Sequence, residues 1–513
     1  MLAKLRSMAV IGIDAFEIGI EADISEMLPS FTIVGLPDGA VRESRERVMS
    51  AIKNCGFEFP ARKVTINMAP ADVKKEGSAF DLPIAIGLLM ASSQVSAESA
   101  GNYIVVGELS LDGSVKSIKG MLSMAICARE LGAKGMIVPK DNAQEAAVAE
   151  GVSIYPVENL TEALEFLQGT RSIAPHVTDL PSLFNRARKY SIDFKDVKGQ
   201  EHIKRSLLVA AAGGHNIMMI GPPGSGKTML ARRLPTILPD LTLNEALETT
   251  KIHSVAGLLE PNTPLLATRP FRSPHHTISE AGLIGGGSFP RPGEVSLSHH
   301  GVLFLDELPE FAKNVLENLR QPLEDGKVTI SRALISLCYP ARFMLAAALN
   351  PCPCGYYTDP RHECSCSPQQ VQKYMAKISG PLLDRIDIHV EVPALGYDEL
   401  AQKTHGEDSA SLRAKVVAAR KIQTDRFAAE TKIFCNAHME SKHIRKFCEL
   451  EENSQTLLKT AIERLGLSAR AYDRILKVSR TIADLDGKEN ILSSHIAEAI
   501  QYRSLDRKLW MGG

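Results

Sequence analysis

A glycine-rich loop at positions 221–228 carries the residues with the clearest chemistry. It reads Gly-Pro-Pro-Gly-Ser-Gly-Lys-Thr and fits the pattern G-x-x-x-x-G-K-T. In loops of this pattern, backbone N–H groups converge on phosphate oxygens, the lysine reaches the β- and γ-phosphates, and the hydroxyl ligates Mg²⁺. The sequence therefore predicts binding of ATP and Mg²⁺. The candidate nucleotide-binding residues are Gly221, Pro222, Pro223, Gly224, Ser225, Gly226, Lys227 and Thr228.

The segments on both sides of this loop are those that a phosphate site needs. The apolar run 215–220 predicts a buried strand, and 229–234 predicts the start of a helix. The N-terminus of that helix would direct a partial positive charge toward the phosphates. A plain glycine turn is the alternative interpretation, but the fixed positions and both flanks favour a phosphate-binding loop.

Two acids follow a second apolar run, 301–305, further along the chain. Asp306 could complete the Mg²⁺ shell, and Glu307 could polarise the attacking water. Acids after a strand are weak evidence alone, because turns often carry them. Downstream of a phosphate-binding loop, they predict ATP hydrolysis and not only nucleotide binding.

Four of the nine cysteines form a compact cluster with the spacing C-x-C, nine residues, C-x-C. Four thiolates in such a span can close a tetrahedron around Zn²⁺, which would be structural because the protein fills every ligand position. His362 could replace one ligand. The alternative is a set of reduced, unligated thiols, which would be prone to oxidation. The candidate zinc ligands are Cys352, Cys354, Cys364 and Cys366.

The composition sets broad limits on the fold and the partners. A net charge of -1 over 513 residues means that any nucleic-acid surface must be a local patch. No apolar run approaches the roughly 18 residues of a membrane span, and we expect a cytoplasmic protein with no membrane partner. The chain is predicted to be α/β, and its later part shows helical patterns, most clearly over 411–427 and 457–485. The expected parts are an alternating strand and helix domain at 1–170, a linker at 171–190, a nucleotide-binding domain at 191–391 with a cysteine loop at 350–367, and a helical domain at 392–513.

These motifs, taken in order, resemble the AAA+ ATPases. An Asp-x-x-Gly-Gln opening at 196–200 precedes the phosphate loop, and Leu-Ala-Ala-Ala-Leu-Asn at 345–350 follows the two acids. The segments 269–279 and 380–387 are similar to the magnesium-chelatase-like branch, and the N-terminal domain points to its YifB/ComM family. The resemblance spans nearly the whole chain. It implies an N-terminal Lon-protease-like domain of the S5-like α/β type, an AAA+ P-loop α/β domain and a C-terminal helical lid.

The resemblance also implies roles for single residues. Asn350 would lie beside the γ-phosphate, and Arg385 would be the arginine finger that enters the neighbouring subunit's site. Arg470 would be the second sensor arginine, in the helical lid, with Arg474 as its competitor. A guanidinium at these places would stabilise the charge of the transferred phosphoryl group. A finger that acts in trans implies self-assembly, and the family implies a homo-hexamer. A surface ion pair is the alternative for each arginine.

The family implies that the partner is DNA, either single-stranded or branched. It also implies that the activity is branch migration or helicase activity, in recombination and natural transformation. The segment 321–332 predicts a hairpin with Asp325 and Gly326 in its turn. Lys327 and Arg332 would then face the nucleic-acid backbone in a ring. An ordinary solvated hairpin is the alternative.

Three other functions remain open at this point. An ATP-dependent Lon-like protease would need a serine and a lysine where this chain has Ala79 and Leu122, while Ser78 and Lys119 are out of register. A magnesium-chelatase motor subunit that inserts metal into a porphyrin is the second. An assembly factor that binds ATP only as a switch is the third, and Glu307 argues against it.

Overall fold

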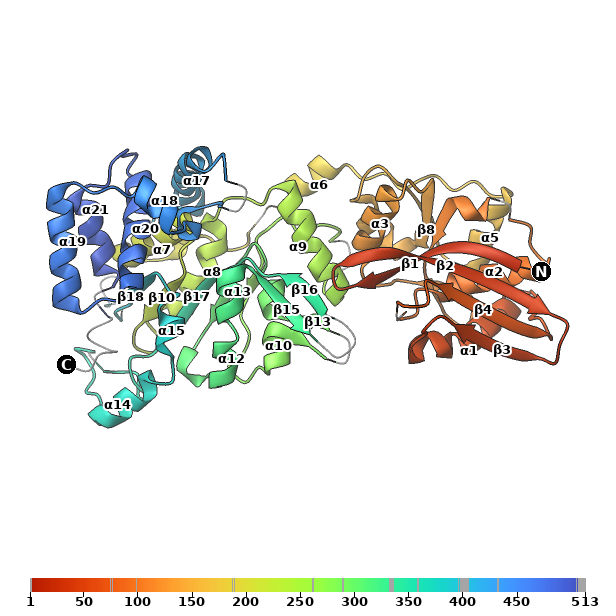
Figure 1. The fold of residues 1–513 in the computed structure, drawn as a ribbon, viewed down its shortest axis with the longest axis horizontal. Coiled ribbons are helices and arrows are strands. Elements are labelled where there is room, and N and C mark those ends of the chain that lie inside the picture. The colour runs from red at the N-terminus through yellow and green to blue at the C-terminus, as the bar shows by residue number, and fades with distance from the viewer. Residues whose placement is uncertain are drawn as a thin grey trace. The chain divides into compact units, whose positions relative to one another are not determined.

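The computed structural model describes residues 2–505 except 74, 76, 98, 187, 189, 261–262, 288–289, 332–335, 358, 395, 397–405, 431–432 and 504. The chain forms two compact units (Figure 1). The first consists of Met1–Ala187 together with Leu243–Ala267, and the second of Arg188–Thr242 and Thr268–Gly513. The segment 243–267, which the sequence placed in the nucleotide-binding domain, thus packs with the first unit. No helix in these described residues is both long and apolar enough to cross a membrane.

The first unit is built on a seven-stranded sheet with the order β3-β4-β2-β1-β5-β8-β9. Its most buried helix, α2 (Asp81–Ala91), packs on β1 and β2. The added helix α9 (Leu243–Ala256) lies on α3, where the Gly120 N–H donates to the Ser254 carbonyl at 3.3 Å. The strands are β1 (Leu2–Ile11), β2 (Asp14–Ser25), β3 (Ser30–Val34), β4 (Lys63–Ala69), β5 (Tyr103–Val105), β8 (Gly135–Pro139) and β9 (Ser153–Val157). The other helices are α1 (Gly39–Asn54), α3 (Met121–Glu130), α4 (Ala143–Ala147), α5 (Leu160–Gln168) and α6 (Leu180–Arg186).

The second unit contains a five-stranded, fully parallel sheet with the order β11-β14-β17-β10-β18. The three central strands are entirely buried, as expected for a parallel sheet with both faces covered. Their carboxyl ends meet at one edge, where ligands of open α/β sheets bind. This arrangement is an AAA+ type α/β fold. The strands are β10 (Ile217–Ile220), β11 (Phe271–Arg272), β14 (Val302–Leu305), β17 (Met344–Leu349) and β18 (Ile388–Glu391).

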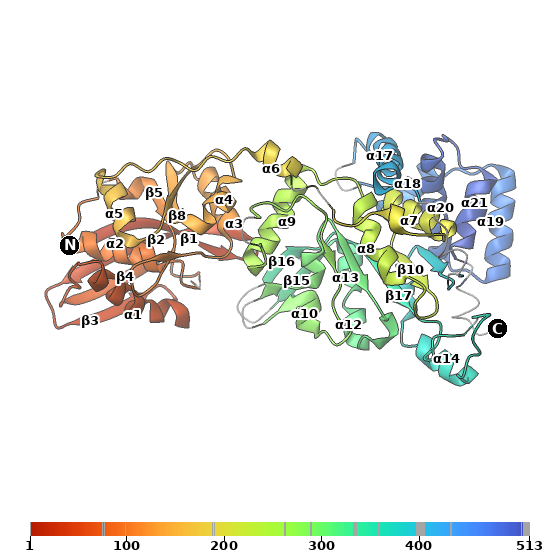
Figure 2. The same ribbon diagram turned by 180° about the vertical axis from the view of Figure 1, so that it is seen from behind.

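The C-terminal part of this unit is a helical bundle that shares the core of the sheet domain. Leu412 and Val416 of α17 and Ile475 and Ile482 of α20 belong to the same buried cluster as Leu207 of α7. Figure 2, seen from behind, shows α7 beside α20 and α17, in agreement with their contacts. The elements are α7 (Glu201–Gly213), α8 (Lys227–Ile237), α17 (Ser409–Arg426), α18 (Ser441–Phe447), α19 (Glu452–Leu465), α20 (Ala469–Leu485) and α21 (Ser493–Gln501).

The helical pattern over 457–485 is divided between two helices. Gly466 adopts a φ of +64° and ends α19, because an L side chain at this left-handed position would be strained. The Ser468 side chain then caps α20 by accepting the Ala471 N–H at 3.2 Å.

The hairpin prediction at 321–332 was wrong about its turn. Asp325 ends the helix α13 (Arg320–Asp325), and Gly326 is its C-cap with a φ of +63°. The strands that pair are instead β15 (Lys327–Ser331) and β16 (Ser336–Pro340), with Lys327 opposite Pro340. Lys327 is exposed at the base of this hairpin, whereas Arg332 lies outside the described residues.

Smaller elements complete the second unit around the sheet edge. They are β12 (Gly285–Gly286), β13 (Arg291–Pro292), α10 (Glu280–Ile284), α11 (Glu294–Leu297), α12 (Lys313–Glu317), α14 (Pro368–Met375) and α15 (Gly380–Leu383).

Candidate nucleotide-binding and hydrolysis site

The glycine-rich loop joins β10 to α8, as the sequence predicted. Gly224 and Gly226 have φ values of +76° and +89°, which L side chains rarely adopt. Gly226 is also the residue before the first turn of α8, so the free N–H groups of that turn face the loop. The backbone is therefore folded for contact with an anion.

Lys227 is held inside the loop by oxygen atoms. Its Nζ donates to the carbonyls of Gly221 and Pro222 at 2.8 and 2.9 Å and lies 3.3 Å from Oδ1 of Asn350. Burial lowers the pKa of Lys227 to about 8, while Asp306 and Glu307 act in the opposite direction. The lysine is thus a cation at neutral pH. It is held at the loop, next to the side chain of Asn350, which follows β17.

The two predicted Mg²⁺ ligands lie together, Thr228 in the first turn of α8 and Asp306 directly after β14. The Thr228 hydroxyl donates to Oδ2 of Asp306 at 2.6 Å. A hydroxyl and a carboxylate are the hard oxygen donors that Mg²⁺ prefers, so this pair fits the ion. These donors come from α8 and from the end of β14, which links the two sequence motifs in space.

Glu307 projects from the same edge with its side chain 55% exposed. Its backbone is left-handed, with a φ of +53°, which is uncommon for a residue other than glycine. Such strained positions concentrate at functional sites. The carboxylate is therefore accessible to solvent beside the metal-binding pair.

His276 is a residue at this site that the sequence prediction missed. Its Nδ1 lies 3.4 Å from Oε2 of Glu307. It follows β11, which neighbours β14, and residues after adjacent parallel strands meet at the same edge. The sequence alone could not predict that His276 lies beside Glu307, because this depends on β11 being the neighbour of β14 in the sheet. His276 gives the candidate general base a polar neighbour.

The four cysteines of the loop after β17 come together. Sγ of Cys352 lies 3.3 Å from Cys354 and 3.7 Å from Cys364, and Cys354 lies 3.5 Å from Cys364. All four sulfur atoms, including that of Cys366, lie within 4.8 Å of one another, and no disulfide joins them. A tetrahedral zinc site with Zn–S bonds of ~2.3 Å separates its sulfurs by about 3.8 Å, so the cluster fits Zn²⁺. His362 faces Asp359 at 3.3 Å, and the four thiols suffice as ligands.

The cysteine loop also packs on the phosphate loop. A Cβ atom added to Gly355 would lie 2.6 Å from Cδ of Pro223. Both loops line a cavity of about 620 Å³, in which Gly221 and Pro222 of the phosphate loop face Tyr357. The cysteine cluster thus supports one wall of the candidate nucleotide site.

The three candidate arginines lie together at the other end of the sheet. Arg385 follows α15, is 7% exposed, and pairs with Glu324. Arg470 of α20 lies 3.3 Å from Asp384, and Arg474 pairs with Asp387. Arg470 is therefore beside the Arg385 segment, and Arg474 is the more buried of the two sensor candidates.

Comparison with known proteins shows matches along almost the whole chain. Residues 193–400 match the family model "Magnesium chelatase, subunit ChlI", residues 20–142 match "Subunit ChlI of Mg-chelatase", and residues 406–503 match "Magnesium chelatase, subunit ChlI C-terminal". Competence protein ComM of Haemophilus influenzae is 46% identical over 512 residues, which cover 99% of this chain and 98% of the relative. Uncharacterized protein YifB of Escherichia coli is 45% identical over 511 residues, with the same coverage of 99% and 98%.

A more distant relative links the chain to the chelatase subunits. Magnesium-chelatase subunit ChlI of Euglena gracilis is 24% identical over 336 residues, which cover 60% of this chain and 82% of that protein. The matched ATPase region contains the phosphate loop and the Thr228–Asp306 pair, and it supports ATP hydrolysis with Mg²⁺. From these matches and the fold, the chain belongs to the magnesium-chelatase-like AAA+ ATPases of the YifB/ComM family.

Proposed function

We propose that this chain is a ring-forming ATPase that couples ATP hydrolysis to the remodelling of DNA, with branch migration as the reaction. The contact between Thr228 and Asp306 carries the ATPase half of the proposal, because it joins the phosphate loop to the acidic strand end. The DNA half is supported by the competence protein that is 46% identical over 99% of the chain, whose name points to natural transformation.

In this proposal each group at the sheet edge has one task. Lys227 neutralises the β- and γ-phosphates, and Thr228 and Asp306 hold Mg²⁺, which would neutralise charge on the same oxygens. Glu307 accepts the proton of the attacking water, and His276 holds its carboxylate in place. Asn350 lies 3.3 Å from the Lys227 ammonium and orients it toward the γ-phosphate.

The place of Arg385 supports a role in the neighbouring subunit. The Asp387 N–H donates to the Asn216 carbonyl at 3.0 Å just before β10 and β18 begin, whereas the phosphate loop follows the end of β10. The four residues of β10 separate these two ends by roughly 13 Å. Arg385 would therefore complete the site of the next subunit in a ring, with Arg470 as the second sensor arginine in the helical lid and a homo-hexamer as the assembly.

Zn²⁺ is the metal that the four-thiol cluster would hold. Thiolates select zinc over the hard cations, and the sulfur spacing suits a tetrahedron. A hydrogen bond from the backbone of Tyr356 lowers the pKa of Cys354 to about 5, which favours the thiolate form that binds metal. The metal would be structural and would hold the loop against Pro223.

The β15–β16 hairpin is the proposed contact with single-stranded or branched DNA. Lys327 is exposed on β15, and Arg332 continues the same segment. In a ring, copies of these side chains would form a local basic surface on a chain of net charge -1. Such a surface would bind the phosphate backbone without reading sequence.

The alternative functions have less support. Ser78 donates its hydroxyl to Glu108, and Leu122 is fully buried, so no serine–lysine pair forms at the protease positions. The chelatase subunit of Euglena gracilis is 24% identical and corresponds to 60% of the chain. Cleavage of an unfolded protein and metal insertion into a porphyrin are the assays for these two functions.

The test is branch migration on a synthetic four-way DNA junction. Wild-type protein with ATP and Mg²⁺ should convert the junction to product, and Glu307→Gln should bind it without conversion. Lys327→Ala should weaken binding and reduce its salt dependence by about one phosphate contact. Lys415→Ala is the matched control, since this lysine is half-exposed on α17 and pairs with Glu407. No conversion and no salt-dependent DNA binding under any nucleotide condition would refute the DNA half.

A further inference from the structure

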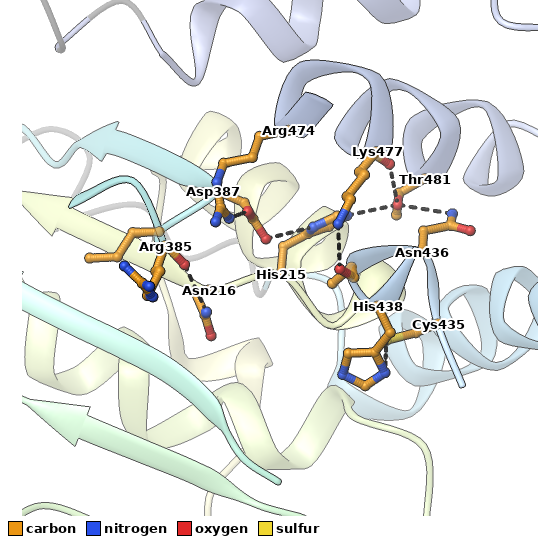
Figure 3. Close-up of polar contacts among 12 residues, drawn as sticks. His215, Asn216, Arg385, Asp387, Cys435, Asn436, His438, Arg474, Lys477 and Thr481 are labelled. Carbon is orange, nitrogen blue, oxygen red and sulfur yellow. Dashed lines mark hydrogen bonds and ion pairs between the residues drawn. The ribbon is translucent and has the colours of Figure 1, made fainter. Parts of the chain in front are cut away.

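A buried polar network joins the helical bundle to the sheet domain, and hydrolysis at the other sheet edge makes no use of it (Figure 3). At its centre is His215, which precedes β10 and is fully buried. Its Nδ1 lies 3.0 Å from Oδ2 of Asp387, and its Nε2 lies 2.8 Å from Oγ1 of Thr481. Burial lowers the pKa of His215 to about 3, so the ring is neutral. It therefore donates to the carboxylate on one side and on the other is within hydrogen-bond distance of the Thr481 hydroxyl, which also lies 3.0 Å from the Lys477 carbonyl.

On the sheet side, the network ends at the segment that carries Arg385, the candidate trans-acting arginine, whereas Arg474 belongs to α20 itself. Asp387 pairs through its other oxygen with Arg474. Asn216, the residue after His215, donates from Nδ2 to the carbonyl of Arg385 at 2.9 Å and accepts the Leu345 N–H at 2.8 Å. Two consecutive residues, His215 and Asn216, thus hold the Asp387 side chain and the backbone that carries Arg385.

On the bundle side, Thr481 of α20 is anchored by further buried groups. Nδ2 of Asn436 donates to Thr481 at 3.1 Å and to Asp484 at 2.8 Å. Asp484 in turn pairs with Arg426 and with Arg480, the latter at 3.1 Å. Thr481 is therefore fixed relative to the rest of the bundle and would move with it.

Two glycines before His215 allow the sheet domain and the helical bundle to approach closely. A Cβ on Gly213 would lie 2.2 Å from Nε2 of His215 and 2.6 Å from Oγ1 of Thr481. A Cβ on Gly214 would lie 2.7 Å from Sγ of Cys435, and this residue has a φ of +71°. A side chain at either position would push the bundle away from the sheet.

We propose that His215 is a positioning residue through which helix α20 sets the orientation of Arg385. The neutral imidazole is a rigid connector with one hydrogen bond to each side. A shift of α20 would move Thr481, His215 and Asp387 together, and with them Arg385, the proposed finger for the next subunit. This inference rests on the proposed trans role of Arg385.

The test removes the Thr481 hydroxyl. It then asks whether a subunit loses its own phosphate loop or the arginine finger that it supplies to its neighbour. Thr481→Val should lower kcat by about tenfold and leave the KM for ATP within about twofold, because its own phosphate loop is unchanged. Thr481→Ser keeps the hydroxyl and should restore the rate. His215→Gln should act in the same direction as Thr481→Val. Thr236→Val is the matched control, since the Thr236 hydroxyl lies 2.8 Å from Ser409 at another buried contact between sheet domain and bundle. It should retain full activity.

Mixed rings separate a positioning role from a structural one. Lys227→Ala subunits lack a working pocket but keep their arginines, and they should restore activity to Thr481→Val. Arg385→Ala subunits have a working pocket but no finger, and they should not restore it. Recovery with Arg385→Ala, or activity of Thr481→Val equal to that of Thr236→Val, would overturn the inference. If Arg385→Ala and Lys227→Ala fail to restore each other, the trans arrangement itself is wrong and the inference falls with it.

Discussion

The two ends of the parallel sheet in the second unit carry polar groups in opposite situations. At the carboxyl ends of the strands, Lys227 is held by loop oxygens, and Glu307 is half-exposed and ready for a ligand. At the amino ends, His215 and Asp387 are buried and bonded to other side chains. The first edge is arranged for chemistry, because its groups can exchange partners. The second is arranged to hold geometry, because each of its groups already has one.

The largest effects should follow from changes at the hydrolysis edge. Lys227→Ala should abolish nucleotide binding, since it removes the main cation at the phosphates. Glu307→Gln should keep binding and lose turnover by at least about a hundredfold, because it removes the carboxylate that takes the proton of water. Nucleotide affinity and phosphate release measure the two effects. Normal turnover of Glu307→Gln would show that another group is the base.

Changes in the buried network should lower the free energy of unfolding. Asp484→Ala leaves Arg426 and Arg480 without their buried carboxylate and should cost about 3–5 kcal/mol of unfolding free energy. Lys415→Ala, which removes an exposed ion pair with Glu407, should cost at most about 1 kcal/mol. Urea unfolding measures both. Equal costs would show that the buried network contributes no more to stability than an exposed ion pair.

The cysteine cluster should bind metal and support the hydrolysis edge. Purified, reduced protein should contain about one zinc per chain, and Cys352→Ser should lower that content. Because Gly355 packs on Pro223, the same change should weaken ATP binding severalfold. Cys338→Ser, an exposed cysteine outside the cluster, is the control. Metal analysis that finds no zinc would rule out the site.

Nucleotide binding should also depend on pH. Burial lowers the pKa of Lys227 to about 8, well below the usual value for a lysine, so its charge is present below pH 8 and is lost as the pH rises through that value. Phosphate would favour the charged form, and ATP affinity should fall about tenfold between pH 7 and 9. Lys227→Arg keeps its charge and should show a flat profile. A flat profile for the wild type would mean that the lysine does not titrate in this range.

Local patterns predicted the sheet domain well. The glycine loop, the Asp306–Glu307 strand end and the cysteine spacing are short motifs whose geometry follows from neighbouring residues, and the structure brings each set together. The α/β class and the buried strands before the two motifs were also expected, since a short apolar run precedes each motif. Family resemblance, confirmed by the 46% identical relative, supplied the rest.

Long-range packing is what the sequence could not supply. Gly326 suits a hairpin turn and a helix C-cap equally, and the preceding helix decided between them. Helix α9 joins the first unit through contacts with α3, whose surface no local pattern reveals. His276 and the His215 network depend on strand order and on where the bundle packs, so they became visible only in the fold.

Turnover of an equal mixture of Lys227→Ala and Arg385→Ala subunits tests the central claim most directly, since each variant disables a different edge of the sheet. If the two edges of neighbouring subunits form one site, random rings should pair an intact pocket with an intact finger at about a quarter of their interfaces. We therefore expect each variant alone to be inactive and the mixture to regain a comparable fraction of the wild-type ATPase rate. No recovery in rings shown to contain both variants would contradict the account.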